Sequence, residues 1–448
     1  MDIDEIIDKV VELNNAKKIG ELHRFLEDVN SADFPQIFEA IKEERVIMVY
    51  RLLSKEKAAE VFVELDHDMQ EELINGLTDA EIKNMMNEIY MDDAADLIEE
   101  MPADVVKRIL ANTKSDNRKI INQLLKYPEN TAGTLMTTEF IDFEDSMTVK
   151  EAFKVIKEKG LRKETVYNCY VLAKDRTLLG VVDIKALLVA DRDKLVKDIM
   201  DINVITTNTL DDQEEVVKMF DKYSCVAIPV VDKQNRLVGI ITIDDAIDVM
   251  QEETLEDFEK MAALQPTEDT YLKTSVFTHA KNRIIWLLIL MISAMITGGI
   301  IEYFENAIQA LPLLVAFIPT IMGTGGNCGS QSSTLIIRGL AMDEITIKDC
   351  LRAMFKELKV GALVGIGLAI IETVIILIQY QDLKTALVIS ATLMLTVIVS
   401  KELGVLLPMG AVKAKLDPAI IAAPLLTTLV DTASVLMFFM IASMAFGL

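Results

Sequence analysis

The 448-residue sequence contains little of what zinc enzymes and ATP-driven pumps require. Its four cysteines occur without Cys-x-x-Cys spacing, and its three histidines form no His-Glu-x-x-His motif. The pattern therefore indicates neither a disulfide framework nor a zinc site, and it excludes an intramembrane zinc protease. A Gly-x-x-x-x-Gly-Lys-Ser/Thr phosphate-binding loop is also missing, so an ATP-driven pump would lack its motor. The residues concerned are Cys169, Cys225, Cys328, Cys350, His23, His67 and His279.

Charged residues are scarce after residue 280. Residues 281–448 contain 11 basic and 11 acidic side chains, whereas residues 1–280 contain 34 basic and 59 acidic ones and hold the whole net charge of −25. A strongly acidic first part repels nucleic acid and anionic lipid. The long uncharged runs of the second part indicate membrane-spanning helices. The N-terminus, MDIDEIIDKV, is acidic where a signal peptide would be basic and then apolar, so we expect the first part to stay in the cytoplasm.

Residues 1–127 predict an all-α domain. Apolar residues recur at helical spacing, as in Ala58, Val61, Phe62 and Leu65, with Glu and Lys between them. The segment AAEVFVEL returns 36 residues later as AADLIEEM, and glycine and proline are rare. Stacked helical repeats form superhelices with binding surfaces, so we expect a superhelical, acidic N domain.

Two similar α/β modules follow, at 128–198 and 199–250. The segment RTLLGVVDIKALL in the first parallels NRLVGIITIDDAI in the second. This repeated pattern of strands and a helix resembles a tandem pair of cystathionine-β-synthase (CBS) domains. Such pairs sense nucleotides or metal ions and regulate the protein that carries them. An acidic helix at 244–264 and a linker at 265–282 lead to the uncharged part of the chain.

Residues 283–448 predict an all-α membrane domain of five spans. The stretch at 306–337 exceeds the ~20 residues that one crossing needs. It also contains Pro312, Pro319 and the run GTGGNCGSQ, so we expect it to be broken or re-entrant. Basic loops between spans two and three and before span five predict a cytoplasmic N-terminus and an external C-terminus. The expected spans are 284–301, 306–337, 358–379, 385–408 and 418–446.

Asp431 is the strongest candidate for a functional residue in the membrane domain. A charged side chain at the centre of a spanning helix costs about 2.5–3.5 kcal/mol and usually faces a cavity, a pore or a partner. The alternative is a carboxylate that Thr427, Thr428 or Ser434 satisfies locally. Asp417 precedes the same span, where we expect the inner mouth of a pore.

Other polar residues of the spans allow two interpretations. The run GTGGNCGSQ either lets the backbone approach a ligand, with Asn327 and Gln331 as donors and acceptors, or packs helices closely. We expect a structural role for Glu372. We also expect the adjacent Lys401 and Glu402 to satisfy each other or to mark a kink.

Carboxylates crowd the first part of the chain. Asp92 and Asp96 share one helical face, and the helix at 244–264 carries acids on more than one face. A single exposed acid is usually only solvated, but acids this dense repel one another unless cations lie between them. Oxygen ligands without histidine or cysteine select Mg²⁺ or Ca²⁺, so we expect a sensor that binds Mg²⁺ weakly at several carboxylates.

The order of these parts resembles the MgtE family of magnesium channels along essentially the whole chain. The most specific motifs are GTGGNCGSQSSTLIIRGLA at 323–341 and DPAIIAAPLLTTLVD at 417–431. The resemblance implies a homodimer in the cell membrane with one central pore for hydrated Mg²⁺. It assigns Asp431 to the pore and Asp417 to its cytoplasmic mouth, and we add Asn327 of the first motif as a pore candidate.

The resemblance also implies that cytoplasmic Mg²⁺ closes the pore by bridging the N domain, the CBS pair and the acidic helix, which plugs the channel. Loss of Mg²⁺ would unmask repulsion and separate these parts. Moving a gate from mostly open to mostly closed requires about 5.5 kcal/mol of differential binding, which several weak sites can supply together. The matching residues are Glu60, Asp92, Asp96, Asp212, Glu214, Asp245, Asp248, Glu253, Glu256 and Asp257.

The chain departs from the family pattern in the pore and between the CBS domains. Ala422 and Ala423 stand where the family often has side chains that can contact hydrated Mg²⁺. Selectivity would then depend on Asp431 and backbone carbonyls. Ser224 replaces an acid that the family can use between the CBS domains, which removes one ligand from a regulatory site.

ATP, which some members of the family bind in the CBS pair, fits this chain poorly. The first module has Asp183 and Ala186 in place of the expected Thr or Ser and the ribose-binding Asp. The second module keeps Thr242 and Asp245. We therefore do not count ATP among the expected cofactors, which leaves Mg²⁺ as both the transported and the regulatory ion.

Two other kinds of CBS-containing membrane protein compete with this interpretation. A chloride channel would need a cationic or amide-lined filter, and Asp431 argues against an anion. A divalent-cation carrier or exporter is the remaining alternative, which the direction of transport would decide. We expect no enzyme activity, because the sequence contains no set of catalytic residues.

Overall fold

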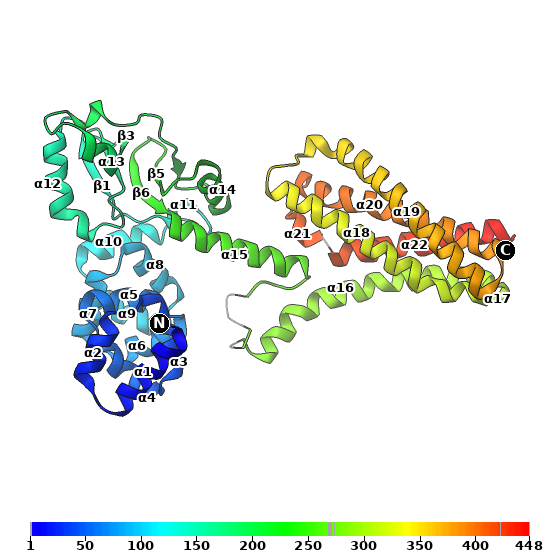
Figure 1. The fold of residues 1–448 in the computed structure, drawn as a ribbon, viewed down its shortest axis with the longest axis horizontal. Coiled ribbons are helices and arrows are strands. Elements are labelled where there is room, and N and C mark those ends of the chain that lie inside the picture. Colours follow the sequence, from blue (N-terminus) through cyan, green and yellow to red (C-terminus); the bar gives the residue numbers. More distant parts are fainter. Residues whose placement is uncertain (1, 268–270, 273, 422, 448) are drawn as a thin grey trace. The chain divides into compact units, whose positions relative to one another are not determined.

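The computed structural model describes residues 2–267, 271–272, 274–421 and 423–447 (Figure 1). These residues form two compact units, Met1–Gln251 and Glu252–Leu448, which we call the N-terminal unit and the C-terminal unit. Ala422 and part of the linker predicted at 265–282 lie outside the described residues. The division falls within the acidic helix, and the other predicted domain boundaries remain predictions.

The first part of the N-terminal unit is all-α, as predicted. Helices two places apart in the sequence pack together, such as α5 with α7 and α7 with α9, which is the arrangement of a helical array. Polar caps separate these helices; Thr78 and Glu81, for example, form a capping box at the start of α7. The elements are α1 (Ile3–Asn15), α2 (Ile19–Glu27), η1 (Ser31–Asp33), α3 (Phe34–Ala40), α4 (Glu43–Tyr50), α5 (Lys55–Val63), α6 (His67–Gly76), α7 (Asp79–Glu88), α8 (Met91–Glu100), α9 (Ala103–Asn112) and α10 (Ser115–Leu124).

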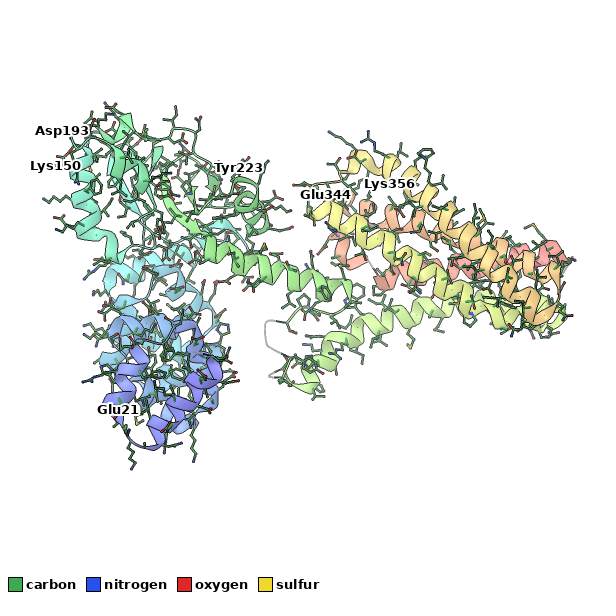
Figure 2. The ribbon with its side chains drawn as sticks, in the orientation of Figure 1. Glu21, Lys150, Asp193, Tyr223, Glu344 and Lys356 are labelled. Carbon is green, nitrogen blue, oxygen red and sulfur yellow. The ribbon has the colours of Figure 1, made fainter. Side chains whose placement is uncertain are left out.

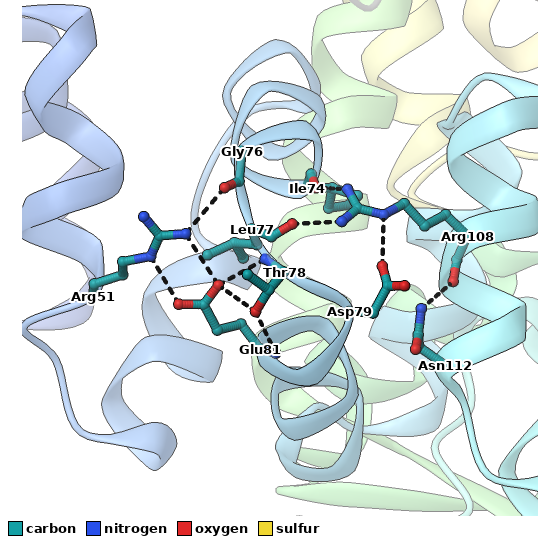
Figure 3. Close-up of polar contacts among 9 residues, drawn as sticks. All are labelled: Arg51, Ile74, Gly76, Leu77, Thr78, Asp79, Glu81, Arg108 and Asn112. Carbon is teal, nitrogen blue, oxygen red and sulfur yellow. Dashed lines mark hydrogen bonds and ion pairs between the residues drawn. The ribbon is translucent and has the colours of Figure 1, made fainter.

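Two arginines fasten successive helices of this array (Figure 3). Arg51, which follows α4, donates to Glu81 at 2.8 and 3.1 Å and to the Gly76 carbonyl at 3.1 Å. Arg108 of α9 donates to Asp79 at 3.0 Å and to two carbonyl oxygens at the C-terminal end of α6. These contacts satisfy carbonyls that a helix leaves unpaired at its end.

Two three-stranded sheets of the same topology follow, as expected for a CBS pair. In each sheet the first strand runs parallel to the second, and the second is antiparallel to the third. Backbone hydrogen bonds of 3.0 Å, from Leu178 to Asn235 and from Leu237 to Arg176, join the two modules. The elements are α11 (Ala132–Leu135), β1 (Ile141–Glu144), α12 (Val149–Lys159), η2 (Gly160–Arg162), β2 (Asn168–Leu172), β3 (Leu178–Asp183), α13 (Ile184–Val189), η3 (Val196–Asp198), β4 (Thr207–Asn208), α14 (Gln213–Tyr223), β5 (Ala227–Val231) and β6 (Leu237–Thr242).

The acidic helix, α15 (Ile243–Met261), begins directly after β6. Its buried Ala246 belongs to one continuous apolar cluster that includes Ile98 of α8 and Ile241 of β6. The N domain, the second CBS module and the start of α15 therefore share a core. This shared core brings acids from distant parts of the sequence together.

The C-terminal unit is all-α. Four of its described helices are long and apolar enough to cross a membrane, within Val276–Tyr303, Ile347–Tyr380, Leu383–Lys413 and Pro424–Phe446. α18 is also long but contains many Gly, Ser and Thr residues, and it packs against α20 and α22. The predicted orientation in the membrane remains a prediction. The elements are α16 (Val276–Tyr303), α17 (Glu305–Ala310), η4 (Pro312–Phe317), α18 (Ile318–Ala341), η5 (Ile347–Asp349), α19 (Cys350–Tyr380), α20 (Leu383–Lys413), α21 (Pro418–Ile421) and α22 (Ala423–Phe446).

The stretch predicted as a broken second span is interrupted before the glycine run rather than at it. Pro312 opens the 3-10 segment η4, and Pro319 lies in the first turn of α18. Proline suits both positions because the first residues of a helix need no N–H donor. The run GTGGNCGSQ lies inside α18, which is a continuous helix.

Candidate functional site

The N-terminal unit contains a cluster of carboxylates that starts at the first turns of α8. Asp92 is only 9% exposed, and its Oδ1 has no hydrogen-bond partner. Asp93 is half-buried, whereas Asp96, one turn further along, is more exposed to solvent. An unpaired carboxylate is costly to bury, so Asp92 is a candidate for contact with a cation.

Acids from three other segments face α8. Glu139 precedes β1, Glu164 precedes β2, and Asp244 and Asp245 lie at the start of α15. We call Asp92, Asp93, Asp96, Glu139, Glu164, Asp244 and Asp245 the acidic cluster. Among the described residues, no ion pair neutralises the α8 members or Asp245.

The pKa values of the acidic cluster are raised, first by burial and then by the neighbouring negative charges. Burial raises the pKa of Asp92 well above its usual range, with further contributions from Asp93 and Asp245. Burial and then the charge of Asp245 raise the pKa of Asp93 to about 7 and that of Glu164 to about 8. The pKa of Asp245 rises to about 6, since burial outweighs its hydrogen bond from Thr242. The cluster therefore repels its own negative charge, which a bound cation would relieve.

Asp96 and Asp248 belong to the margin of this cluster. Burial and then the charge of Asp93 raise the pKa of Asp96 to about 7, although its solvent exposure makes it the member that water screens most. Asp248 is exposed, and burial of Glu64 together with the charge of Asp248 raises the pKa of Glu64. The structure thus brings the predicted Asp92, Asp96 and Asp245 together, with Asp248 beside them.

The regulatory residues predicted from the sequence do not include four members of the cluster, which are Asp93, Glu139, Glu164 and Asp244. The signal for Asp93 and Asp244 was present, because each is adjacent to a predicted residue. Glu139 and Glu164 are isolated in the sequence, and a backbone hydrogen bond from Glu164 N to Glu139 O at 2.9 Å joins them in the fold. No local pattern carries that information.

Three predicted regulatory residues have local partners instead. Glu60 is exposed, accepts a hydrogen bond from Ser31 at 2.9 Å and pairs with Lys57 at 3.6 Å. Asp212 caps α14 by accepting from the Glu214 backbone N–H at 2.9 Å. Glu214 pairs with Lys218 at 3.0 Å. A role for these three as metal ligands stays a prediction.

The donor set suits a hydrated cation rather than a dehydrated one. Within the described ranges, no group of three or more His, Cys, Asp or Glu side chains is arranged so that it could hold a metal ion directly. Mg²⁺ keeps several of its waters and is held by few carboxylates, so a wide all-oxygen cluster fits it better than it fits zinc.

In the second CBS module, the two residues expected to bind a nucleotide form a hydrogen bond with each other. Thr242 Oγ1 donates to Asp245 Oδ2 at 2.6 Å, and Asp245 also belongs to the acidic cluster. In the first module, Asp183 caps α13 by accepting from Lys185 N at 2.7 Å. The first module therefore uses for helix capping the position where a nucleotide-binding hydroxyl was expected.

In the C-terminal unit, the end of α15 meets the segment before α21. Lys260 Nζ lies 2.9 Å from Asp417 and 2.7 Å from Glu256. Burial alone would lower the pKa of Lys260, but these two hydrogen bonds raise it, so the ammonium stays charged. Asp417 also accepts from the Ala419 backbone N–H at 2.8 Å. The predicted mouth residue is thus bound to the predicted plug helix, which also carries Glu253 and Asp257.

Asp431 lies half-buried on α22, and two of the three local partners considered for it, Thr428 and Ser434, form no hydrogen bond with it. Thr428 donates to the Pro424 carbonyl at 3.0 Å, and Thr432 lies 2.8 Å from Thr297. Ser434 is buried with no hydrogen-bond partner for its Oγ. Thr428 and Ser434 therefore do not satisfy the Asp431 carboxylate, which favours the functional interpretation of this residue.

Both interpretations of the glycine run apply, each to a different face of α18. A Cβ on Gly325 would lie 2.8 Å from Thr396 and 2.9 Å from Val430, so this face packs against α20 and α22. Asn327 and Gln331 line a cavity of about 1230 Å³ instead. Glu344 and Lys356, labelled in Figure 2, line the same cavity. The glycines thus allow close packing while the amides stay accessible.

The prediction that Lys401 and Glu402 satisfy each other is wrong. The Lys401 ammonium bonds to Ser332 and Glu357, which lie on two other helices, while Glu402 Oε1 is buried without a partner. Adjacent residues of a helix point about 100° apart, so they do not face each other. Glu372 is half-buried on α19, with its role open.

Three family models match consecutive parts of this chain. A model described as the MgtE intracellular N domain matches residues 29–130, and the CBS domain model matches residues 132–193 and 196–252. A model named MgtE and described as a divalent cation transporter matches residues 318–441. The matches follow the order of parts inferred from the sequence.

Full-length relatives and solved structures agree with these matches. The chain is 32% identical over 443 residues to the magnesium transporter MgtE of Bacillus subtilis, covering 99% of this chain and 98% of the relative. It is 33% identical over 441 residues to MgtE of Thermus thermophilus, covering 96% and 97%.

Two solved structures resemble the first part of the chain. One is the soluble part of a magnesium transporter, with TM-score 0.53 and 29% identity over 56% of this chain and 99% of that one. The other is the cytosolic domain of the Mg²⁺ channel MgtE in complex with ATP, with TM-score 0.51 and 34% identity over 54% and 99%. The members of this family are named transporters rather than enzymes, which agrees with the expectation that the protein has no enzyme activity. The chain belongs to the MgtE family of divalent cation transporters.

Proposed function

We propose that this protein is a Mg²⁺-selective channel for magnesium uptake that cytoplasmic Mg²⁺ closes. Relatives that match nearly its whole length are named magnesium transporters. We place it in the cell membrane as a homodimer, with its N-terminal domains in the cytoplasm and its C-terminus outside. A pore needs more helices around it than one copy of the C-terminal unit supplies, which supports the dimer.

Asp431, Asn327 and Asp417 are the proposed contacts of the permeating ion. Mg²⁺ gives up its waters reluctantly, so a pore that carries it benefits from oxygen atoms that accept hydrogen bonds from a hydration shell. Asp431 supplies negative charge within the spanning helix α22 without a neutralising ion pair among the described residues. The accessible amide of Asn327 on α18 suits the same shell. Asp417 would guide ions at the cytoplasmic mouth once Lys260 has moved away.

The observation that carries the gating proposal is the buried, unpartnered oxygen of Asp92 within the acidic cluster. Hydrated Mg²⁺ between α8 and the start of α15 would relieve the repulsion that raises the pKa of these acids. Binding there holds the start of α15 against the N domain. Because α15 is one continuous helix, restraint at its start is transmitted to its end, where Lys260 meets Asp417.

The first test is the current through the purified, reconstituted protein while cytoplasmic Mg²⁺ is stepped from near zero to millimolar levels. Inward Mg²⁺ current that shuts off as cytoplasmic Mg²⁺ rises is the expected result. Current that ignores cytoplasmic Mg²⁺ would remove the gate from the proposal and leave the pore. Slow tracer flux without channel current would favour the alternative, a CBS-regulated divalent-cation carrier or exporter.

ATP is not part of the proposal. A relative's cytosolic domain was solved with ATP, and this chain keeps Thr242 and Asp245 in its second module. Asp183 of the first module caps a helix, and Asp245 is shared with the acidic cluster. Calorimetric titration of the protein with ATP in the absence of Mg²⁺ tests this exclusion, and measurable binding would overturn it.

A further inference from the structure

Three helices of the C-terminal unit meet at a buried charged contact. Lys401 of α20 donates to Ser332 Oγ of α18 at 3.1 Å and lies 3.4 Å from Glu357 Oε2 of α19. Ser332 Oγ in turn donates to the same Glu357 oxygen at 2.6 Å. The side chains of Lys401 and Glu357 are 6% and 13% exposed. Both charges are therefore held away from bulk water, and each depends on the other.

The helices that carry this contact approach one another closely at two glycines. A Cβ on Gly361 of α19 would lie 3.3 Å from the backbone Cα of Ile398 of α20, so this glycine allows the two helices to approach closely. A Cβ on Gly404 of α20 would lie 2.6 Å from the Gly329 carbonyl oxygen and 2.9 Å from Ser332 Cβ. Two glycines thus let α18, α19 and α20 approach at the depth where the charged groups meet, which identifies the contact as a built feature of the unit.

The contact also lies in the wall of the cavity that Asn327 and Gln331 line. Glu357 and Lys401 both contribute to that wall. The other charged residues of the wall include Arg352 and Asp349, which pair with each other at 3.3 Å. The remaining charged wall residues are Glu344 and Lys356. Glu402, which lies next to Lys401 in the chain, is not among the residues that line the cavity. The wall therefore contains three acidic and three basic residues, and removal of one of them changes its net charge.

We propose that Lys401 and Glu357 are a matched charge pair that sets the electrostatic potential beside the ion path. The inference rests on the proposed function, since it assigns Asn327 and its cavity to the path of Mg²⁺. Loss of Glu357 leaves the ammonium unneutralised and repels a divalent cation. Loss of Lys401 leaves the Glu357 carboxylate without its ammonium partner, so the wall becomes more negative and attracts the cation. If the pair only stabilised the packing of the three helices, loss of either residue would impair transport.

The test compares Glu357→Gln, Lys401→Met and the double variant by the external Mg²⁺ concentration that gives half-maximal current. We expect a rise of about threefold or more for Glu357→Gln, a fall of similar size for Lys401→Met, and a return towards the wild-type value in the double variant. High ionic strength should reduce both shifts. Glu372→Gln is the matched control, because it makes the same change on the same helix outside this wall.

Shifts in the same direction for the two single variants, or no shift in either, would overturn the inference. If a single variant fails to fold, Glu357→Asp and Lys401→Arg replace it, and both should stay close to the wild type. A wild-type protein that carries no Mg²⁺ current would defeat the proposed function instead. Thermal unfolding of the wild type, the two single variants and the double variant then tests whether Lys401 and Glu357 interact. Losses of stability in the single variants that simply add in the double variant would overturn the pairing.

Discussion

Asp431 and Asp92 are two acids that the fold withdraws from water without an ion pair among the described residues. Asp431 is half-buried on a spanning helix, and Asp92 is buried in the N-terminal unit with one oxygen unpartnered. Other acids have ordinary structural partners, such as Glu81 with Arg51 and Asp79 with Arg108. Uncompensated burial is expensive, so it persists where function requires it.

Replacement of Asp431 by Ala is expected to reduce Mg²⁺ current by at least about tenfold while leaving the protein folded. The change removes the charge in α22 that attracts the ion, and burying an alanine in a spanning helix costs nothing. Mg²⁺ uptake into protein-loaded liposomes, normalised to the folded peak in gel filtration, measures the effect. Ser434→Ala on the same helix is the control and should retain uptake. Undiminished uptake in the Asp431 variant would remove this residue from the pore.

The raised pKa values of the acidic cluster predict that, without Mg²⁺, the N-terminal unit is more stable at low pH than at high pH. An acid whose pKa is higher in the folded than in the unfolded state binds more protons when folded, so stability falls as pH rises between the two values. For Asp93 that interval runs from the usual 3.8 to about 7, and for Glu164 from 4.5 to about 8.

We therefore expect the melting temperature of the metal-free protein to drop by several degrees from pH 5.5 to pH 8, and millimolar Mg²⁺ to remove most of that drop. Calorimetric melts at both pH values, with and without Mg²⁺, check this. Asp92→Asn should flatten the pH dependence, because the amide removes one charge from the centre of the cluster. A pH dependence that Mg²⁺ leaves unchanged would contradict the assignment of the cluster as a cation site.

At the scale of helices and strands, sequence patterns predicted what depends on local spacing. The duplicated strands around Gly180 and Gly239 predicted two sheets of equal topology, and apolar periodicity predicted the helical N domain. Glu139 and Glu164 could not be paired from sequence, since a tertiary backbone contact joins them. Lys401 was assigned to its neighbour Glu402 because its true partner, Glu357, lies on another helix. Partners across helices depend on packing, which local periodicity does not encode.

Gly404→Ala is expected to destabilise the C-terminal unit by about 1–3 kcal/mol, because the new methyl group would overpack the α18–α20 contact. It would meet the Gly329 carbonyl oxygen, which is backbone and cannot rotate away. Gly410→Ala, on the same helix, is the matched control, since nothing lies within 4 Å of the added carbon. Alanine favours helix over glycine, so the control should be neutral or slightly stabilising. Thermal denaturation in detergent measures both variants, and equal melting temperatures would contradict the packing described for α18.

At the scale of the whole molecule, α15 is the covalent link between the part of the chain proposed as a Mg²⁺ sensor and the part proposed as a pore. Its first residues belong to the N-terminal unit with the acidic cluster, and its last turn carries Lys260 beside Asp417 in the C-terminal unit. A ligand changes a two-state gate only through its different affinity for the two states. The cluster meets that condition if separation of α8 from α15 destroys the Mg²⁺ site.

The double variant Asp92→Asn/Asp245→Asn is therefore expected to need a several-fold higher cytoplasmic Mg²⁺ concentration to close, with its open current unchanged. Each substitution keeps the shape of the side chain and removes one negative charge from the proposed cation site. Losing about tenfold in affinity for the closed state corresponds to about 1.4 kcal/mol, a fraction of the about 5.5 kcal/mol that full gating requires, so closure shifts rather than disappears. Single-channel recordings with stepped cytoplasmic Mg²⁺ measure the midpoint, and Glu56→Gln, which removes one charge from an exposed acid of α5, is the control for each single substitution. A midpoint unchanged in the double variant would place the Mg²⁺ sensor elsewhere in the molecule, whereas a changed open current would show that these acids act on permeation.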